Sequence, residues 1–72
     1  MNIFVLEDDE AIGIGLSYSL ENEGYTVTVE KTVASAKSAI AKGSFDLYIL
    51  DLTLPDGNGY EICKLIFLCL LD

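Results

Sequence analysis

Two hydrophobic periods alternate along this chain, and each change of period marks a boundary between predicted elements. Short apolar runs predict buried strands at residues 2–6 and 45–50. Residues 25–30 alternate β-branched with other residues, which predicts a strand open to solvent on one side, as at a sheet edge. Between and after these strands, helical spacing predicts helices at about 9–23 and 33–41. Strands joined through helices indicate an α/β fold with parallel pairing and right-handed crossovers.

Local signals support the ends of the helices. The first helix has acidic residues at its start and one apolar stripe at Ile12, Leu16 and Leu20. Gly24 is expected to end it in a left-handed conformation. Thr32 precedes the second helix, which stops near Lys42 and Gly43.

The last apolar segment allows two interpretations. Residues 66–72 could form a further strand, but this would leave a very short helix before it and no connecting segment. One helix over about 59–71 is therefore preferred. Ten of those thirteen residues are apolar, so this helix is not expected to lie on the surface of a monomer.

Composition narrows the possible functions. The chain has 72 residues and a net charge of −8, from twelve acids against four lysines, with no histidine. This balance argues against direct binding to nucleic acid, and the missing imidazole removes the usual general base. The apolar runs are too short for a membrane span, and no export signal is evident. Cys63 and Cys69 are expected to point to different sides of a helix as reduced thiols, which favours the cytoplasm.

Carboxylates follow two of the predicted strands. Glu7 and Asp8 come directly after residues 2–6, and Asp51 ends the apolar run Leu47–Leu50. Ligands of open α/β sheets bind at the carboxyl ends of strands, so these side chains are expected to meet there. Two unit charges 4 Å apart repel by about 4 kcal/mol at an effective dielectric of 20, which favours a divalent cation between them. Oxygen ligands with octahedral geometry are typical of Mg²⁺.

The acid pair, the strand-end Asp51 and the turn Leu54–Gly59, taken together in this order, resemble the receiver domain of two-component response regulators. The resemblance covers essentially the whole chain, but only about the first half of the family's flavodoxin-like fold. It implies strand order 2-1-3 in a single truncated domain over residues 1–72.

The resemblance also implies a function, that of a phosphoacceptor module and not an enzyme. Asp51 matches the phosphoacceptor, Glu7 and Asp8 the acidic pair, and Thr53 the residue whose backbone carbonyl binds the metal. Asp8 and Asp51 would then bind Mg²⁺ directly and Glu7 through water, and the implied partner is a sensor histidine kinase.

The chain departs from the family after Asp51. The family's phosphoryl-binding hydroxyl and lysine lie on two later strands, and Lys64 matches neither position. Phosphorylation is therefore expected to be impaired, with little conformational switching. The edge of the third strand would also stay unprotected, which predicts a homodimer through this edge and the C-terminal helix, rebuilding a sheet of about six strands. The alternative function is a non-signalling half-receiver whose main property is this self-assembly.

Other interpretations of the same residues are weaker. Taken singly, each acid could be a solvated turn or a strand-end cap. A related magnesium-dependent phosphatase would want an acid where Thr53 stands. Gly13 and Gly15 lack the third glycine of a dinucleotide motif and fall within a predicted helix. Residues 56–59 lack the spacing of a calcium loop and are better interpreted as a turn with residues suited to positive φ.

Overall fold

A three-stranded parallel sheet forms the middle layer of the computed structural model, which describes residues 1–51, 53–54 and 56–70, leaving aside the side chains of 53–54, 58–59 and 68–70. Strand β1 (Asn2–Leu6) lies between β2 (Thr26–Glu30) and β3 (Leu47–Leu50). The order is therefore 2-1-3 with all pairs parallel, as predicted. The third strand begins two residues later than the predicted start at Phe45.

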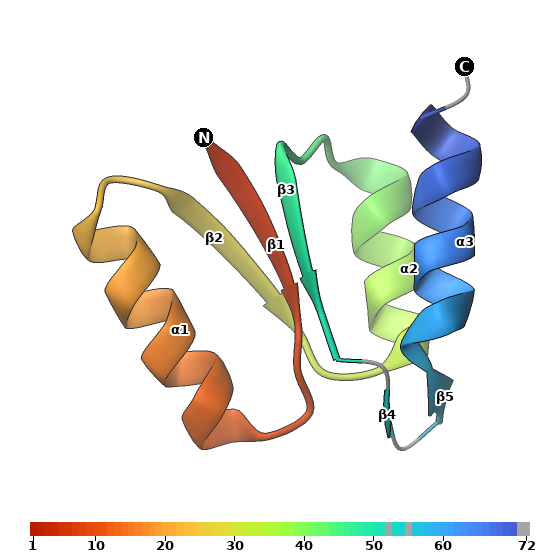
Figure 1. Ribbon diagram of the computed structural model, residues 1–72, viewed down its shortest axis with the longest axis horizontal. Helices are drawn as coiled ribbons and strands as arrows, with labels where there is room; N and C mark the ends of the chain where they lie inside the picture. The colour runs from red at the N-terminus through yellow and green to blue at the C-terminus, as the bar shows by residue number, and fades with distance from the viewer. Residues whose placement is uncertain (52, 55, 71–72) are drawn as a thin grey trace.

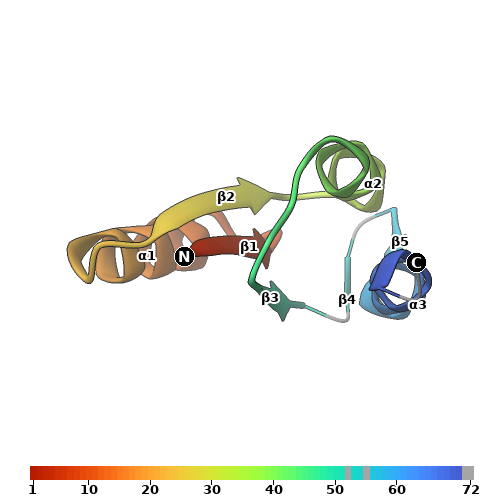
Figure 2. The ribbon, with the colours of Figure 1, turned by 90° about the horizontal axis from the view of Figure 1, so that it is seen from above.

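Three helices cover the two faces of this sheet. Helix α1 (Glu10–Asn22) lies against one face, while α2 (Val33–Lys42) and α3 (Gly59–Leu70) lie side by side against the other (Figures 1 and 2). The three-layer α/β architecture is confirmed. The C-terminal segment is helical through Leu70, as preferred over a fourth strand; the last two residues lie outside the described part. None of the described helices is long and apolar enough to cross a membrane.

The main core lies between the sheet and the α2–α3 layer. Phe4 and Leu6 of β1 point into it because side chains alternate along a strand, and Phe4 contacts the rings of Phe45 and Tyr48 at centroid distances of 5.2 and 5.9 Å. The buried members of this core are Phe4, Leu6, Val33, Ala36, Ile40, Ile62 and Ile66. On α3 only one side is covered, since Phe67 remains 61% exposed.

Helix α1 meets the other face of the sheet through Gly13 and through part of the predicted stripe. Gly13 is the buried residue of this helix, and a Cβ atom added there would lie 3.3 Å from Val29 Cγ1 of β2. Ile12 is 50% exposed, whereas Leu16 and Leu20 are half-buried. The missing side chain at Gly13 lets the helix approach β2 closely.

The segment after β3 forms a small hairpin. Strands β4 (Thr53–Leu54) and β5 (Gly57–Asn58) pair antiparallel, with Thr53 opposite Asn58. The residue types of this turn are suited to positive φ, but among the described residues only Gly24 has one, with φ 91°. Gly24 follows α1 and confirms the predicted left-handed stop. Pro55, part of the turn motif, lies outside the described residues.

Candidate functional site

Backbone hydrogen bonds align the carboxyl ends of the three strands. The Asp51 N–H donates to the Leu6 carbonyl at 2.8 Å, which extends the pairing of β3 with β1 by one residue. The Glu7 N–H donates to the Glu30 carbonyl at 3.0 Å and ties the end of β1 to the end of β2. Because these amides are fixed, the Glu7 and Asp51 side chains leave the sheet from neighbouring points.

The three predicted carboxylates come together at this edge. Glu7, Asp8 and Asp51 each offer an oxygen, and these atoms all lie within 4.8 Å of one another. Glu7 and Asp51 are half-buried and Asp8 is exposed. Thr53 lies two residues beyond Asp51, at the start of β4, where its backbone pairs with Asn58.

Crowding changes the protonation of Glu7. A side-chain hydrogen bond with Asp51 is the largest cause that holds the pKa of Glu7 above its usual range, and desolvation and the nearby charges of Asp51 and Asp8 act in the same direction. A hydrogen bond between two carboxyl groups requires a proton on one of them. Without a cation, this crowding therefore makes Glu7 hold a proton up to a higher pH than an ordinary glutamate does.

The donor set fits a small divalent cation. Ligands on opposite sides of a six-coordinate Mg²⁺ are about 4.2 Å apart, since each lies 2.0–2.1 Å from the ion. The oxygens of Glu7, Asp8 and Asp51 lie within 4.8 Å of one another, so small side-chain movements suffice to bring them to that spacing. Hard carboxylate oxygens at a partly solvated edge also leave room for the waters that Mg²⁺ keeps.

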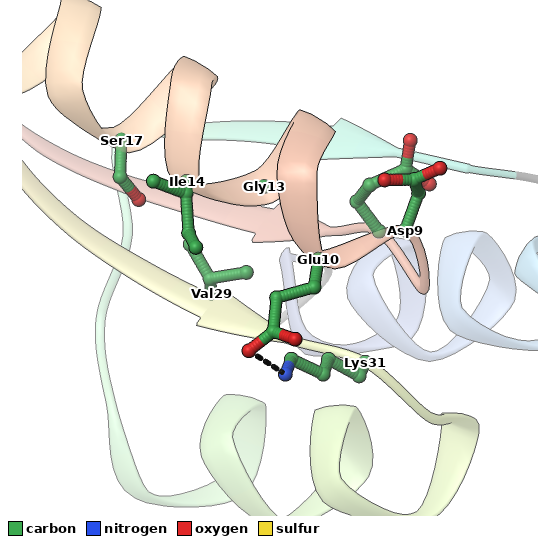
Figure 3. Close-up of a pocket in the computed structure, with 8 residues that line it drawn as sticks. Asp9, Glu10, Gly13, Ile14, Ser17, Val29 and Lys31 are labelled. Atoms are coloured by element: carbon green, nitrogen blue, oxygen red, sulfur yellow. Dashed lines mark hydrogen bonds and ion pairs between the residues drawn. The ribbon is translucent and has the colours of Figure 1, made fainter.

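Neighbouring acids serve the structure instead. The Asp9 side chain caps α1 by accepting a hydrogen bond from the Ile12 N–H at 3.1 Å. Glu10 forms an exposed ion pair with Lys31 at 3.3 Å. This pair closes one end of a hollow of about 250 Å³ between α1 and β2, whose apolar wall includes Ile14 and Val29 (Figure 3).

A second hollow adjoins the carboxylates themselves. It has a volume of about 310 Å³ and lies between α1 and β3, with Leu16, Ile49 and Val5 beside Glu7 and Asp51. Apolar walls next to ionised groups reduce their solvation, so charges at this edge interact more strongly than on an open surface.

Asp56 connects the segment after β3 to helix α2, and the local sequence pattern did not predict this contact. Its carboxylate accepts hydrogen bonds from the Val33 N–H at 2.8 Å and the Ala34 N–H at 3.1 Å, at the first turn of α2. The hydrogen bond from Val33 is the largest cause that holds the pKa of Asp56 below its usual range, and the bond from Ala34 acts in the same direction. A carboxylate 23 positions along the chain thus caps this helix, and only the preference of aspartate for helix N-termini could have hinted at it.

Comparison with known proteins gives one consistent result. The sequence model of the response regulator receiver domain matches residues 3–67. The chain is 43% identical over 61 residues to the swarming motility regulation protein RssB of Serratia marcescens, covering 85% of this chain and 28% of that protein. It is 38% identical over 63 residues to the response regulator ArlR of Staphylococcus epidermidis, covering 88% of this chain and 29% of that protein.

Solved structures agree with the sequence comparison. The non-phosphorylated HemR receiver domain from Leptospira biflexa superposes with a TM-score of 0.85 at 42% identity, covering 90% of this chain and 52% of that one. Response regulator TrrA from Thermotoga maritima, solved in complex with Mg²⁺-BeF, gives a TM-score of 0.84 at 31% identity, covering 90% and 56%. The chain thus spans just over a quarter of these curated relatives and about half of the solved chains.

Proposed function

Because this chain belongs to the response regulator receiver domain family, we propose that it accepts a phosphoryl group on Asp51 as a module of a two-component phosphorelay. The observation that carries the proposal is the meeting of Glu7, Asp8 and Asp51 within 4.8 Å at the carboxyl ends of β1 and β3. Carboxylates repel one another, so a backbone that holds three of them together favours the binding of a cation between them.

The proposed metal ligands are the carboxylates of Asp8 and Asp51 and the backbone carbonyl of Thr53, with Glu7 acting through water. When bound, Mg²⁺ supplies positive charge that draws together the carboxylates and the oxygens of an incoming phosphoryl group. A bound cation would favour the ionised form of Glu7, whose pKa is raised chiefly by its hydrogen bond with Asp51.

The chemical step is a displacement at phosphorus. An ionised Asp51 oxygen forms the new P–O bond, and the bond from phosphorus to the donor's leaving atom breaks, with its electron pair leaving on that atom. In acetyl phosphate the leaving group is acetate, and in a phosphohistidine donor it is the imidazole nitrogen. The step uses the ionised form of the Asp51 carboxylate, from which no proton has to be removed.

A sensor histidine kinase in the cytoplasm is the proposed donor, and the chain acts as a signalling module and not as an enzyme. The support is membership of the receiver family, together with an acceptor that lies on the surface edge of the sheet.

The test is incubation with acetyl phosphate and Mg²⁺, followed by intact-mass measurement. The parent chain should gain one phosphoryl group, and the Asp51→Asn variant should gain none. Asp46→Asn is a matched control, because Asp46 precedes the opposite end of β3, where it accepts a hydrogen bond from the Asn2 N–H at 2.7 Å. A parent chain that stays unmodified, or modification that persists in Asp51→Asn, would contradict the proposal.

A second candidate function is self-assembly into a homodimer. Within the described part of the chain, β3 pairs only with β1, so its other edge has no strand beside it. Leu47 on this strand is 43% exposed and Phe67 on α3 is 61% exposed, and a second copy could cover both. Light scattering should show twice the monomer mass, and Phe67→Lys should reduce it. A folded monomer at micromolar concentration would rule this candidate out.

A further inference from the structure

Side-chain hydrogen bonds join the β4–β5 hairpin to helix α2. Asp56 lies at the turn of the β4–β5 hairpin, and its two carboxylate oxygens accept hydrogen bonds from Val33 and Ala34 at 2.8 and 3.1 Å. These two amides belong to the first turn of α2, where no carbonyl of the same helix can accept from them. The hairpin thus supplies acceptors that the helix lacks.

The remaining amides of that turn have local partners. The Ser35 N–H donates to the Thr32 hydroxyl at 3.1 Å, and the Ala36 N–H donates to the Thr32 carbonyl at 3.0 Å. Two different residues therefore cap one helix end. Thr32 lies directly before α2 and caps it locally, whereas Asp56 caps it from the hairpin that follows Asp51.

Close packing accompanies the hydrogen bonds. A Cβ atom added at Gly57 would lie 3.0 Å from Val33 Cγ2 and 2.7 Å from Glu61 Oε2. Glu61 is an exposed, flexible side chain and could move away, but Val33 is buried and only 4% exposed. The hairpin backbone therefore rests directly on the first turn of α2, in a position that leaves little freedom to slide.

From this contact we infer that Asp56 is a positioning residue for the metal site: it fixes the hairpin to α2 and thereby places the Thr53 carbonyl next to the carboxylates. The inference rests on the proposed function, because it concerns the Mg²⁺ that Asp51 needs. Thr53 begins β4 two residues after Asp51, and its backbone is paired with Asn58 in the same hairpin. Thr53 thus stands in the chain between two anchored groups, the Asp51 amide bonded to Leu6 and the Asp56 carboxylate bonded to α2.

The experiment is a Mg²⁺ titration of the whole chain, followed through backbone amide shifts by NMR at a temperature where circular dichroism shows every variant folded. Asp56→Ala should weaken Mg²⁺ binding about tenfold, the low end of what loss of an outer-shell partner costs. Asp56→Asn keeps one acceptor oxygen and should fall between Asp56→Ala and the parent. If Asp56→Ala does not fold, Asp56→Asn decides the question.

Thr32→Ala is the matched control. It removes the other cap of the same helix end, yet it leaves the hairpin bonded to Val33 and Ala34. Its Mg²⁺ affinity should stay within about twofold of the parent, as expected for separated sites. The inference is overturned if Asp56→Ala binds as the parent does, or if Thr32→Ala weakens binding equally. A parent chain that binds no Mg²⁺ contradicts the proposed function itself, which is a different outcome.

Discussion

Replacing Asp8 by asparagine should stabilise the metal-free chain while removing its response to Mg²⁺. The ligand oxygens of Glu7, Asp8 and Asp51 lie within 4.8 Å of one another, and at that distance two unit charges repel by about 3.5 kcal/mol at a dielectric of 20 and about 0.9 kcal/mol in water. Asp8 is exposed, so the lower value applies, and removing a single such repulsion is the minimum relief. Relief of about 1 kcal/mol is therefore expected, which raises Tm by about 4–8 °C in a chain of this size.

The Mg²⁺ response of the parent has the opposite origin. A ligand that binds only the native state stabilises it by about 1.4 kcal/mol at ten times its Kd. Asp8→Asn lacks one of the proposed direct ligands, so its Tm should stay nearly flat as Mg²⁺ is added. The plots of Tm against Mg²⁺ concentration for the two chains should therefore cross. The variant should have the higher Tm in chelator, and the parent should have the higher Tm at high Mg²⁺.

Thermal melts by circular dichroism, in chelator and across a Mg²⁺ series, measure both effects. Glu21→Gln, at an exposed site in the last turn of α1, removes one negative charge far from the cluster and should keep the full Mg²⁺ response. The reasoning is refuted if the parent ignores Mg²⁺, or if Asp8→Asn melts below the parent in chelator.

Three further outcomes are expected. In urea titrations Gly15→Ala should stabilise the chain by about 1 kcal/mol through helix propensity, since the added Cβ meets nothing within 4 Å. Gly13→Ala should stabilise it less, because the added Cβ lies 3.3 Å from Val29 Cγ1. Equal gains in the two variants would contradict the close approach of α1 to β2. Because the hydrogen bond with Asp51 raises the pKa of Glu7, the Glu7 contribution to metal-free stability should be complete below the ordinary glutamate pKa and be lost as pH rises through the folded value; Glu7→Gln should remove this dependence. The pKa of Asp56 is lowered by the Val33 and Ala34 amides, so its contribution should be complete above the ordinary aspartate pKa and be lost as pH falls through the depressed value; an acid limb unchanged in Asp56→Asn would contradict this.

Much of the site could be predicted because its positions follow from short-range patterns. An apolar strand followed by acids occurs twice, and parallel pairing brings both strand ends to one edge whatever the details of packing. Glu7, Asp8 and Asp51 therefore meet as expected. The roles of these residues as ligands and phosphoacceptor stay predictions, since they depend on an ion and a donor.

The features that escaped prediction depend on contacts between distant segments. Asp56 looks like an ordinary turn residue, and its role as a cap appears only once the hairpin lies against α2, 23 positions away from Val33. The orientation of α1 was predicted only in part, because a hydrophobic stripe includes Ile12 with Leu16 and Leu20 and gives Gly13 no weight. In the structure Gly13 lies against β2, where an added Cβ atom would be 3.3 Å from Val29 Cγ1.

These long-range contacts explain how a repulsive cluster can be held in place before any ion binds. The Asp51 amide is bonded to Leu6, the Glu7 amide to Glu30, and Asp56 to the first turn of α2, so the backbone around the carboxylates is held from three directions. If this backbone were loose, the charges would separate, and a cation would have to gather them at an entropic cost. A rigid perimeter instead keeps the repulsion in the metal-free state, and its release on binding adds to the affinity. For that reason residues that touch no ligand, Asp56 foremost, should influence Mg²⁺ binding as well as stability.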